Sequence, residues 1–299
     1  MSGGWLAQRE RGSPAAMRAL VRVALALGRR AGRLFLYPIC AYFALFSRGT
    51  RRASADYLQR VLGRPPRLAE VMRHYYTFAA TVLDRVYLRA GRYDTFDVRL
   101  DAPSALLADL RARRGCILLG SHLGSFEILR AAGLAEGAPP VNMLMHVEGG
   151  EKLNGVLDAL APEAAPRVIP LGHPGSLLRA QECLERGEIV GILADRGLRE
   201  ERECSCEFLG ASARFPLGPL LLAGLLQAPV ILAFGLYRGG RRYEVKLEPF
   251  AERIELDRRD REGSLRPWVE RYAARLEHHC RDAPYNWFNF YDFWAPAGA

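Results

Sequence analysis

The sequence predicts an α/β fold with a mostly parallel central sheet and helices on both of its faces. Short apolar segments alternate with segments whose apolar residues recur every three or four positions, a pattern typical of strands alternating with amphipathic helices. The run "CILLG" at 116–120 is apolar throughout, which indicates a strand buried on both faces. A chain of 299 residues, of which 49% are hydrophobic, is long enough to bury a large core.

The order of the elements follows from these patterns and from the turn residues between them. Helices are expected over 53–90, interrupted at Pro65-Pro66 because proline cannot continue a helix. Later, "PVILAFGLY", the pair Gly239-Gly240 and "RYEVKLEPF" predict a hairpin. The other expected strands are 95–100, 141–147, 167–172 and 188–195, and the other expected helices are 103–113, 123–134, 151–160, 174–186 and 264–280.

The N-terminal segment combines arginines with apolar residues. If residues 17–33 form a helix, four arginines fall within a sector of roughly 60°. These are Arg18, Arg22, Arg29 and Arg33. An apolar run at 34–46 follows, and such a combination is typical of an element that lies on an anionic membrane surface.

Two other interpretations of this segment stay open. The helices can pack on the domain itself, or they can cross the membrane, although the run at 34–46 is too short to span a bilayer alone. We therefore expect a membrane-associating segment at 1–52 and a main domain at 53–299.

Charge and cysteine usage limit the classes of partner. A formal charge of +9 favours anionic partners such as a phosphate-bearing lipid or an acidic carrier protein. No nucleic-acid-binding motif is visible, so nucleic acid is not an expected partner. The six cysteines form no paired framework, which predicts a reducing compartment. Neither Cys204-Ser-Cys206 nor His278-His279-Cys280 has a common zinc spacing, and no metal site is predicted.

One polar pair follows the buried strand at 116–120. His122 comes directly after it, where open α/β sheets place their ligand sites, and Glu127 stands five residues further on. Within one regular helix this spacing separates two side chains by about 140°, so the pair can meet only if His122 lies in the turn. A neutral imidazole can then take a proton from a hydroxyl while a carboxylate fixes its tautomer.

Alternatives to this base-and-carboxylate pair stay open at this point. His122 and Glu127 can merely satisfy backbone groups at a helix start. Ser121 and Ser125 stand beside the histidine, so a covalent serine route is a further possibility. The string at 120–124 does not, however, have the Gly-x-Ser-x-Gly pattern of a nucleophile elbow.

The wider sequence resembles the late acyltransferases of lipid A biosynthesis, within the lysophospholipid acyltransferase superfamily. The motif stands as His122-Leu-Gly-Ser-Phe-Glu127 inside "GSHLGSFEILRA". Three further segments are similar: "EKLNGVLDAL" with Asn154, "GILADRG", and 208–231 with its core at Phe215–Gly218. The tail "APYNWFNFYDFW" is similar to the subgroup associated with aryl polyene and related pigment-lipid biosynthesis. Where lipid A enzymes tend to have an arginine, this chain has Met145-His146-Val147-Glu148.

The resemblance implies an O-acyltransferase on the cytoplasmic face of a bacterial inner membrane. His122 would deprotonate a hydroxyl of a lipid acceptor, which attacks an acyl thioester, and Glu127 would orient His122. The donor would be an acyl carrier protein or coenzyme A, and no metal or redox cofactor is implied. Two alternatives are a lipid A acyltransferase of the Kdo-lipid A type and a non-catalytic anionic-lipid-binding protein of the same fold.

Several polar residues are candidates for binding the substrates. Arg196, next to Asp195 at a predicted strand end, either holds a phosphate or the carrier's phosphopantetheine arm, or forms an ion pair with Asp195. Arg214 is a similar case. Backbone amides near Gly124 and Gly218, or an arginine, are candidates to stabilise an oxyanion. The substrate-binding candidates are therefore Ser125, Asn154, Asp195, Arg196, Arg214 and Gly218.

The C-terminal segment at 283–294 is dense in aromatic residues. It either packs back on the core or forms the wall of an acyl tunnel or a belt at the membrane interface, where amphipathic rings are favoured.

Overall fold

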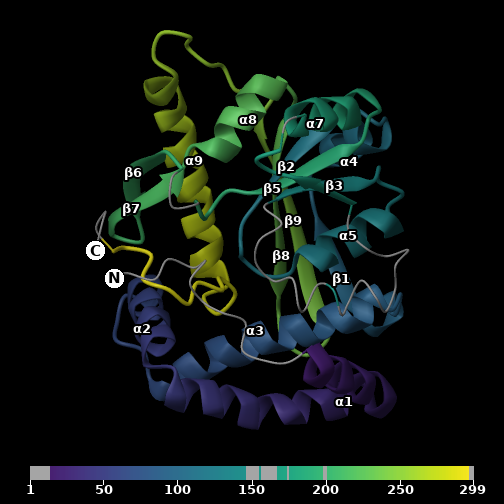
Figure 1. The fold of residues 1–299 in the computed structure, drawn as a ribbon, viewed down its shortest axis with the longest axis vertical. Coiled ribbons are helices and arrows are strands. Elements are labelled where there is room, and N and C mark those ends of the chain that lie inside the picture. Colours follow the sequence, from purple (N-terminus) through teal and green to yellow (C-terminus); the bar gives the residue numbers. More distant parts are fainter. Residues whose placement is uncertain (1–13, 146–154, 156–166, 174, 198–200, 296–299) are drawn as a thin grey trace.

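A computed structural model describes residues 14–145, 155, 167–173, 175–197 and 201–295 (Figure 1). The helices are α1 (Pro14–Phe46), α2 (Arg48–Leu62), α3 (Leu68–Arg89), α4 (Ser104–Arg111), α5 (Phe126–Ala135), α7 (Ser176–Glu185), α8 (Gly218–Leu226) and α9 (Arg261–Asp282). The strands are β1 (Asp97–Asp101), β2 (Cys116–Gly120), β3 (Val141–Met145), β4 (Arg167–Pro170), β5 (Ile189–Leu193), β6 (Glu203–Phe208), β7 (Ala211–Pro216), β8 (Val230–Tyr237) and β9 (Arg242–Ala251). A 3-10 turn, η2, spans Tyr93–Thr95.

The central sheet of the described residues has the strand order β1-β9-β8-β2-β5-β3-β4. From β8 to β4 the neighbours pair in parallel, whereas β9 pairs antiparallel with β8, and β1 pairs in parallel with β9. This confirms the mostly parallel sheet and the hairpin around Gly239-Gly240. It also confirms the helix break at Pro65-Pro66, since α2 ends at Leu62 and α3 begins at Leu68.

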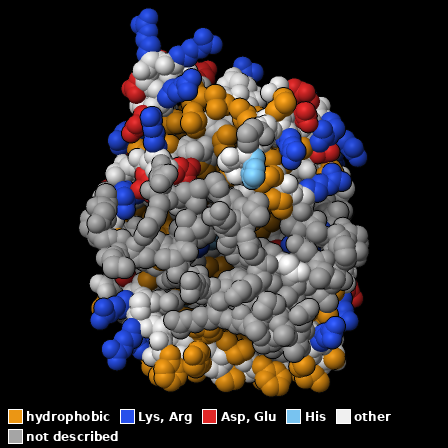
Figure 2. Space-filling model, in the orientation of Figure 1, with side chains coloured by type: hydrophobic (Ala, Val, Ile, Leu, Met, Phe, Trp, Pro, Cys, Tyr) orange, Lys and Arg blue, Asp and Glu red, His pale blue; other side chains and the backbone are white. Residues whose placement is uncertain are grey.

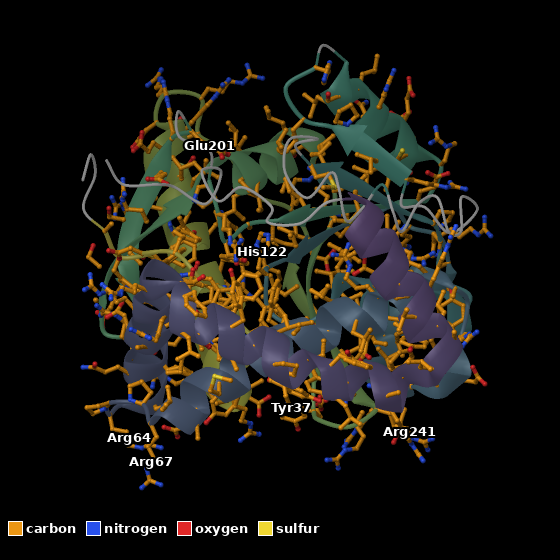
Figure 3. All side chains as sticks on the ribbon, turned by 60° about the horizontal axis from the view of Figure 1, so that its bottom comes forward. Tyr37, Arg64, Arg67, His122, Glu201 and Arg241 are labelled. Carbon is orange, nitrogen blue, oxygen red and sulfur yellow. The ribbon has the colours of Figure 1, made fainter. Side chains whose placement is uncertain are left out.

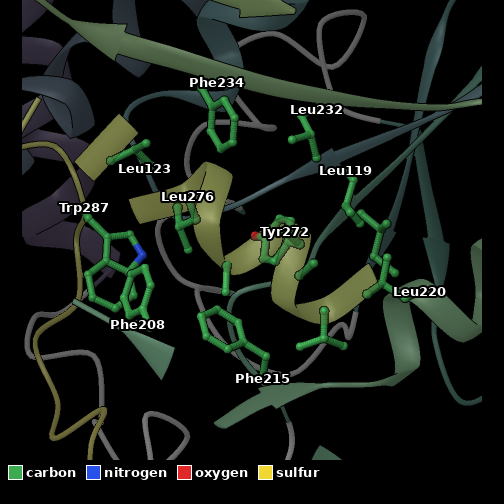
Figure 4. Packing of buried hydrophobic residues seen from close by; sticks show 14 of the residues in the cluster. Leu119, Leu123, Phe208, Phe215, Leu220, Leu232, Phe234, Tyr272, Leu276 and Trp287 are labelled. Carbon is green, nitrogen blue, oxygen red and sulfur yellow. The ribbon is translucent and has the colours of Figure 1, made fainter. Parts of the chain in front are cut away.

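Alternate residues of β2 point to opposite faces of the sheet, and both faces are covered. Ile117 and Leu119 belong to a large core cluster formed with α7, α8 and α9 (Figure 4). Cys116 and Leu118 pack on the other side with Leu106 of α4. The all-apolar run follows from this double burial, because neither face of the strand reaches water.

A third layer, made of α1, α2 and α3, crosses the edge of the sheet where the parallel strands end (Figure 1). Tyr237, the last residue of β8, belongs to one apolar cluster with Leu36 of α1 and Tyr87 of α3. The turn after β2 ends at the same edge, so this layer lies beside the predicted functional residues.

Arg29 and Arg33 of α1 do not take part in the outward basic stripe that the sequence predicts. Arg29 donates to the Asp84 carboxylate from Nε at 2.7 Å and from Nη2 at 2.8 Å, and Arg33 donates to it at 3.0 Å. Tyr243 adds a fourth hydrogen bond at 2.8 Å. Asp84 is fully buried, so its charge needs these donors, and it turns both arginines inward. Arg22 remains exposed, and the side chain of Arg18 lies outside the described part.

The outward face of α1 is apolar instead. Beyond a break in the helix at Gly28 (φ 82°), six large side chains are at least half exposed. They are Leu34, Phe35, Tyr37, Tyr42, Leu45 and Phe46. Figure 2 shows hydrophobic side chains along this lower edge of the molecule. None of the described helices combines the length and the apolar character needed to cross a membrane.

Exposed arginines follow the apolar face in the chain and also stand on other segments. Arg48 and Arg52 are at the start of α2, and Arg64, Arg67 and Arg241 are exposed outside α1. Figure 3 shows Tyr37, Arg64, Arg67 and Arg241 along the outer side of the layer, and His122 toward the middle of the molecule. We call the six apolar side chains of α1 the apolar face. The division into 1–52 and 53–299 stays a prediction.

The hairpin of β6 and β7 is missing from the expected elements. Cys204, Cys206 and Phe208 are buried and alternate with exposed Ser205 and Glu207, a period of two that indicates a strand. The alternation of apolar and polar residues at 203–208 was therefore a strand signal that the sequence already contained. The helix expected at 151–160 lies outside the described residues, apart from the helical residue 155.

Replacing Asp84 with alanine should destabilise the protein strongly. Removal of the carboxylate leaves Arg29 and Arg33 partly buried without their anion, which costs about 3–5 kcal/mol. The matched control is Asp101→Ala, which breaks a surface ion pair with Lys246 and should cost less than about 1 kcal/mol. The free energy of unfolding measured with denaturant tests this, and equal losses would contradict the anchoring role of Asp84.

Candidate active site

His122 lies in the turn between β2 and α5, as the sequence predicts. β2 ends at Gly120 and α5 begins at Phe126. The turn is held on both sides of the histidine: its N–H donates to Asp195 Oδ2 at 3.0 Å, and its carbonyl accepts from the Phe288 N–H at 3.0 Å. One third of the side chain is exposed (33%), so the imidazole is held by the protein and still open to a substrate.

The carboxylate bound to the imidazole is that of Asp195. Nδ1 of His122 lies 2.8 Å from Asp195 Oδ1. The two residues meet because β2 and β5 pair in parallel and end together, with Gly120 opposite Leu193. An ionised carboxylate can only accept, so Nδ1 carries the proton and Nε2 is left as the basic atom.

Charges around the pair favour a neutral imidazole and an ionised carboxylate. Burial raises the pKa of Asp195, but His122, Arg196 and the Trp287 indole outweigh it and hold that pKa well below its usual range. Burial and the positive charge of Arg196 lower the pKa of His122 below its ordinary 6.5, although Asp195 acts in the opposite direction. His122 is therefore unprotonated at neutral pH, as a general base must be.

Glu127 does not occupy the position at Nδ1 that the sequence prediction assigned to it. Its Oε1 accepts from Arg85 Nε at 2.8 Å and lies 3.7 Å from Arg89 Nη2. Burial raises the pKa of Glu127, and the two arginines of α3 lower it to a net value below the ordinary one. The first turn of α5 faces α3, so Glu127 is drawn to those cations and ties the two helices together.

Arg196 is close enough to His122 to influence it and is only partly paired. Its Nη2 donates to the Phe288 carbonyl at 2.5 Å, and the guanidinium lies over the Tyr291 ring, 5.4 Å from the centroid. Its Nε is buried and has no partner among the described residues. An arginine beside the base, with a donor to spare, suits a developing negative charge.

Backbone packing around Gly124 explains the glycine and removes one candidate oxyanion donor. Gly124 has φ +81°, and a Cβ there would lie 2.0 Å from the Gly235 carbonyl oxygen. Its N–H donates to the Asn286 carbonyl at 2.9 Å, so it is not available to an oxyanion. The N–H of Ser125 is likewise taken by Gly235, and its buried hydroxyl makes no hydrogen bond within the described part of the chain.

The remaining candidates lie elsewhere or are not described. Arg214 on β7 forms an ion pair with Glu203 at 3.0 Å and donates to the Ala295 carbonyl. Gly218 begins α8, and the carboxylate of Glu201 occupies the space beside its Cα. No contact joins Arg214 or Gly218 to His122 among the described residues. Asn154 lies outside those residues.

The sequence matches a family model described as "Bacterial lipid A biosynthesis acyltransferase" over residues 16–295. The chain belongs to this family. The matched range includes the His122 turn, Asp195 and the aromatic tail, and the family is one of acyltransferases that act in lipid biosynthesis. A search of curated proteins gave no match.

In this acyltransferase the aromatic tail packs back on the core and also holds the site. Leu123 and Trp287 form a β-bridge, flanked by the hydrogen bonds from Gly124 to Asn286 and from Phe288 to His122. The Asn286 side chain bonds the N–H of Tyr237 at 2.7 Å. Packing on the core was one of the two interpretations of the dense aromatic pattern, whereas the pairing of these residues with the turn after β2 was not predicted.

A second histidine, also missed from sequence, fastens the tail to α2 and α3. His74 is fully buried, with Nε2 2.8 Å from the Trp287 carbonyl and Nδ1 2.8 Å from Ser54 Oγ. A carbonyl only accepts, so Nε2 carries the proton and Nδ1 accepts from Ser54. Burial lowers the pKa of His74 to about 4, and the neutral ring is therefore the native form.

The buried His74 should make stability fall as the pH falls from about 6.5 to about 4. Its folded pKa lies below the unfolded one, so the contribution is complete above 6.5 and is lost through this range, by about 3 kcal/mol. Denaturant unfolding of the parent and of His74→Gln measures the difference. His173→Gln, at an exposed histidine, is the control and should keep the parent's pH dependence. A parent-like pH profile for His74→Gln would contradict the assignment.

Proposed function

We propose that this protein is an O-acyltransferase that moves an acyl group from a thioester to a hydroxyl of a lipid acceptor. The observation that carries the proposal is the dyad of His122 and Asp195, with Nδ1 bonded at 2.8 Å and Nε2 left as a base at the end of β2. Family membership supports the acyl transfer, and the dyad supports a route without a protein nucleophile.

The reaction follows from the positions of the protons. Nε2 of His122 takes the proton of the acceptor hydroxyl, whose oxygen attacks the thioester carbonyl. Asp195 stabilises the imidazolium that forms. The tetrahedral intermediate then expels the thiolate, which recovers the proton from His122 and leaves as a thiol.

Arg196 is the best candidate to stabilise the oxyanion in this mechanism. Its charge already acts on His122, its Nε has no partner among the described residues, and the Gly124 amide is occupied. The same guanidinium suits a phosphate of the donor's phosphopantetheine arm. Either role needs a positive charge beside the base, and neither needs a metal or redox cofactor.

The finer identity of the substrates is carried by the resemblance described above. We propose an acyl carrier protein as the donor, with coenzyme A as the alternative, and an aryl polyene or related pigment-lipid as the preferred product class ahead of lipid A. Mass spectrometry of lipids from cells with and without the gene distinguishes these products. A loss confined to lipid A would overturn the pigment-lipid assignment.

We propose that the protein attaches to the cytoplasmic side of a bacterial inner membrane, and the apolar face of α1 supports the attachment to a membrane. Its six side chains are at least half exposed, and the exposed Arg48 and Arg52 follow them in the chain. Exposed apolar residues followed by exposed arginines suit insertion into an anionic monolayer. We therefore propose that the apolar side chains of α1 enter the membrane while arginines contact the headgroups, and that a basic stripe on α1 is not the main membrane contact.

Substitutions in the dyad test the mechanism. His122→Ala should lower acyl transfer by about 10²–10⁴-fold, because the base is lost. Asp195→Asn should cause a comparable loss through the wrong tautomer. Glu127→Gln should have a much smaller effect on turnover, since Glu127 bonds Arg85 and not the imidazole. Initial rates with an acyl-carrier-protein thioester, alongside unfolding curves for each variant, supply the measurement.

The outcomes separate the competing functions. Normal acyl transfer by His122→Ala would contradict the mechanism. A larger loss of activity for Glu127→Gln than for Asp195→Asn would indicate that Glu127, and not Asp195, orients His122. An acyl adduct trapped on Ser121 or Ser125 would indicate a serine hydrolase. Vesicle binding with no transfer to any lipid would favour a lipid-binding protein of the same fold.

Polar substitutions on the apolar face test membrane attachment. Leu34→Ser with Leu45→Ser and Phe46→Ser removes three large exposed side chains and should weaken partitioning to anionic vesicles at least about tenfold. Leu177→Ser with Leu178→Ser, at exposed leucines of α7, is the control, and this variant should bind the vesicles in a flotation assay as the parent does. Equal flotation of both sets would show that α1 is not the attachment surface.

A further inference from the structure

The indole of Trp287 binds the Asp195 carboxylate at the oxygen that the imidazole does not occupy. Its Nε1–H donates to Asp195 Oδ2 at 2.9 Å, while Oδ1 holds the His122 ring. The indole is fully buried and packs against Phe208, with ring centroids 5.3 Å apart (Figure 4). The hydrogen bond is therefore shielded from water.

We propose that Trp287 is a positioning residue that sets the basicity of His122 through Asp195. For its catalytic consequence this inference rests on the proposed function, in which His122 is the base. The competing explanation is that the indole only fills the core, and it predicts no effect on the titration of His122.

The direction of the effect follows from electrostatics. A donor to a carboxylate binds most strongly when the carboxylate charge is not already offset by a neighbouring cation. Asp195 carries that full charge when His122 is neutral and is offset when His122 is protonated. The indole N–H thus stabilises the neutral state of His122 more than the protonated one, and it keeps the base free of a proton.

The backbone fixes the indole relative to the base. Trp287 bridges Leu123, the residue after His122, and Phe288 donates to the His122 carbonyl. On the other side, the Trp287 carbonyl is bonded to the buried His74. The indole and the imidazole are thus held on paired segments, with the Asp195 carboxylate between their two N–H groups.

The first experiment uses the unmodified full-length protein. The chain has four tryptophans, so its indole N–H signals in a ¹⁵N spectrum are few, and Trp287→Phe or a residue-specific label assigns the one from Trp287. We expect the Trp287 signal to shift with the same midpoint as the His122 imidazole on titration, and this linked shift to vanish in Asp195→Asn. A Trp287 signal that ignores the His122 titration would overturn the proposal.

The second experiment removes the donor and keeps an aromatic ring. Trp287→Phe should raise the midpoint of the His122 titration by about one pH unit, a tenfold tighter binding of the proton. The acid limb of kcat/KM should move to higher pH by the same amount. In the Asp195→Asn background, Trp287→Phe should add no further shift, because the two residues act through one contact.

Trp294→Phe is the matched control. It removes another indole N–H of the same aromatic cluster, bonded to the Phe208 carbonyl at 3.3 Å, without touching Asp195. We expect it to leave the His122 titration at the parent value. The positioning role would be contradicted if Trp287→Phe loses stability but keeps the parent titration of His122. An equal shift of that titration in Trp294→Phe would contradict it as well, and Trp287 would then only fill the core.

The two titrations need no substrate, so this inference and the proposed function fail separately. If Trp287 and His122 titrate together but the protein transfers no acyl group, the proposed function is contradicted and the positioning role of Trp287 stands. If the protein transfers acyl groups but the two residues titrate independently, the positioning role is contradicted and the proposed function stands. If Trp287→Phe does not fold, the titration of the Trp287 indole signal in the unmodified protein still tests the positioning role.

Discussion

The site depends on the hydrogen bonds that the buried carboxylate of Asp195 accepts. It accepts three hydrogen bonds, from the His122 backbone, the His122 ring and the Trp287 indole. These donors come from two segments that are distant from Asp195 in the chain. A carboxylate buried completely must have such partners, because an unpaired charge away from water is too costly. Satisfying it brings the turn after β2, the end of β5 and the C-terminal tail together.

Asp84 repeats the same principle at the outer layer of the molecule. It is also fully buried, and it binds Arg29, Arg33 and Tyr243 from α1 and β9. Asp195 thus fixes the turn that carries His122, and Asp84 fixes the helix that carries the apolar face. The helix α1 and the turn that carries His122 are placed relative to each other by α3, which carries both Asp84 and His74.

The local features of this site could be predicted, and the non-local ones could not. The apolar run at 116–120 and the following Gly-Ser-His placed His122 in a turn, which the structure confirms. The spacing of His122 and Glu127 suggested a pair, yet the neighbouring strand β5 brings Asp195 instead. The sequence spacing holds no information on that contact, since it depends on which strands become neighbours. The inward turn of Arg29 has the same origin, because Asp84 is 55 residues away in the chain.

The β-bridge between Leu123 and Trp287 has a consequence for how the enzyme is made. The ribosome completes the sheet strands, from β1 to β9, before it synthesises the segment that pairs with the turn after β2. Until then the turn that carries His122 lacks Asn286, Trp287 and Phe288 as partners. The contacts that hold His122 in place are therefore completed only after the strands of the sheet have been synthesised.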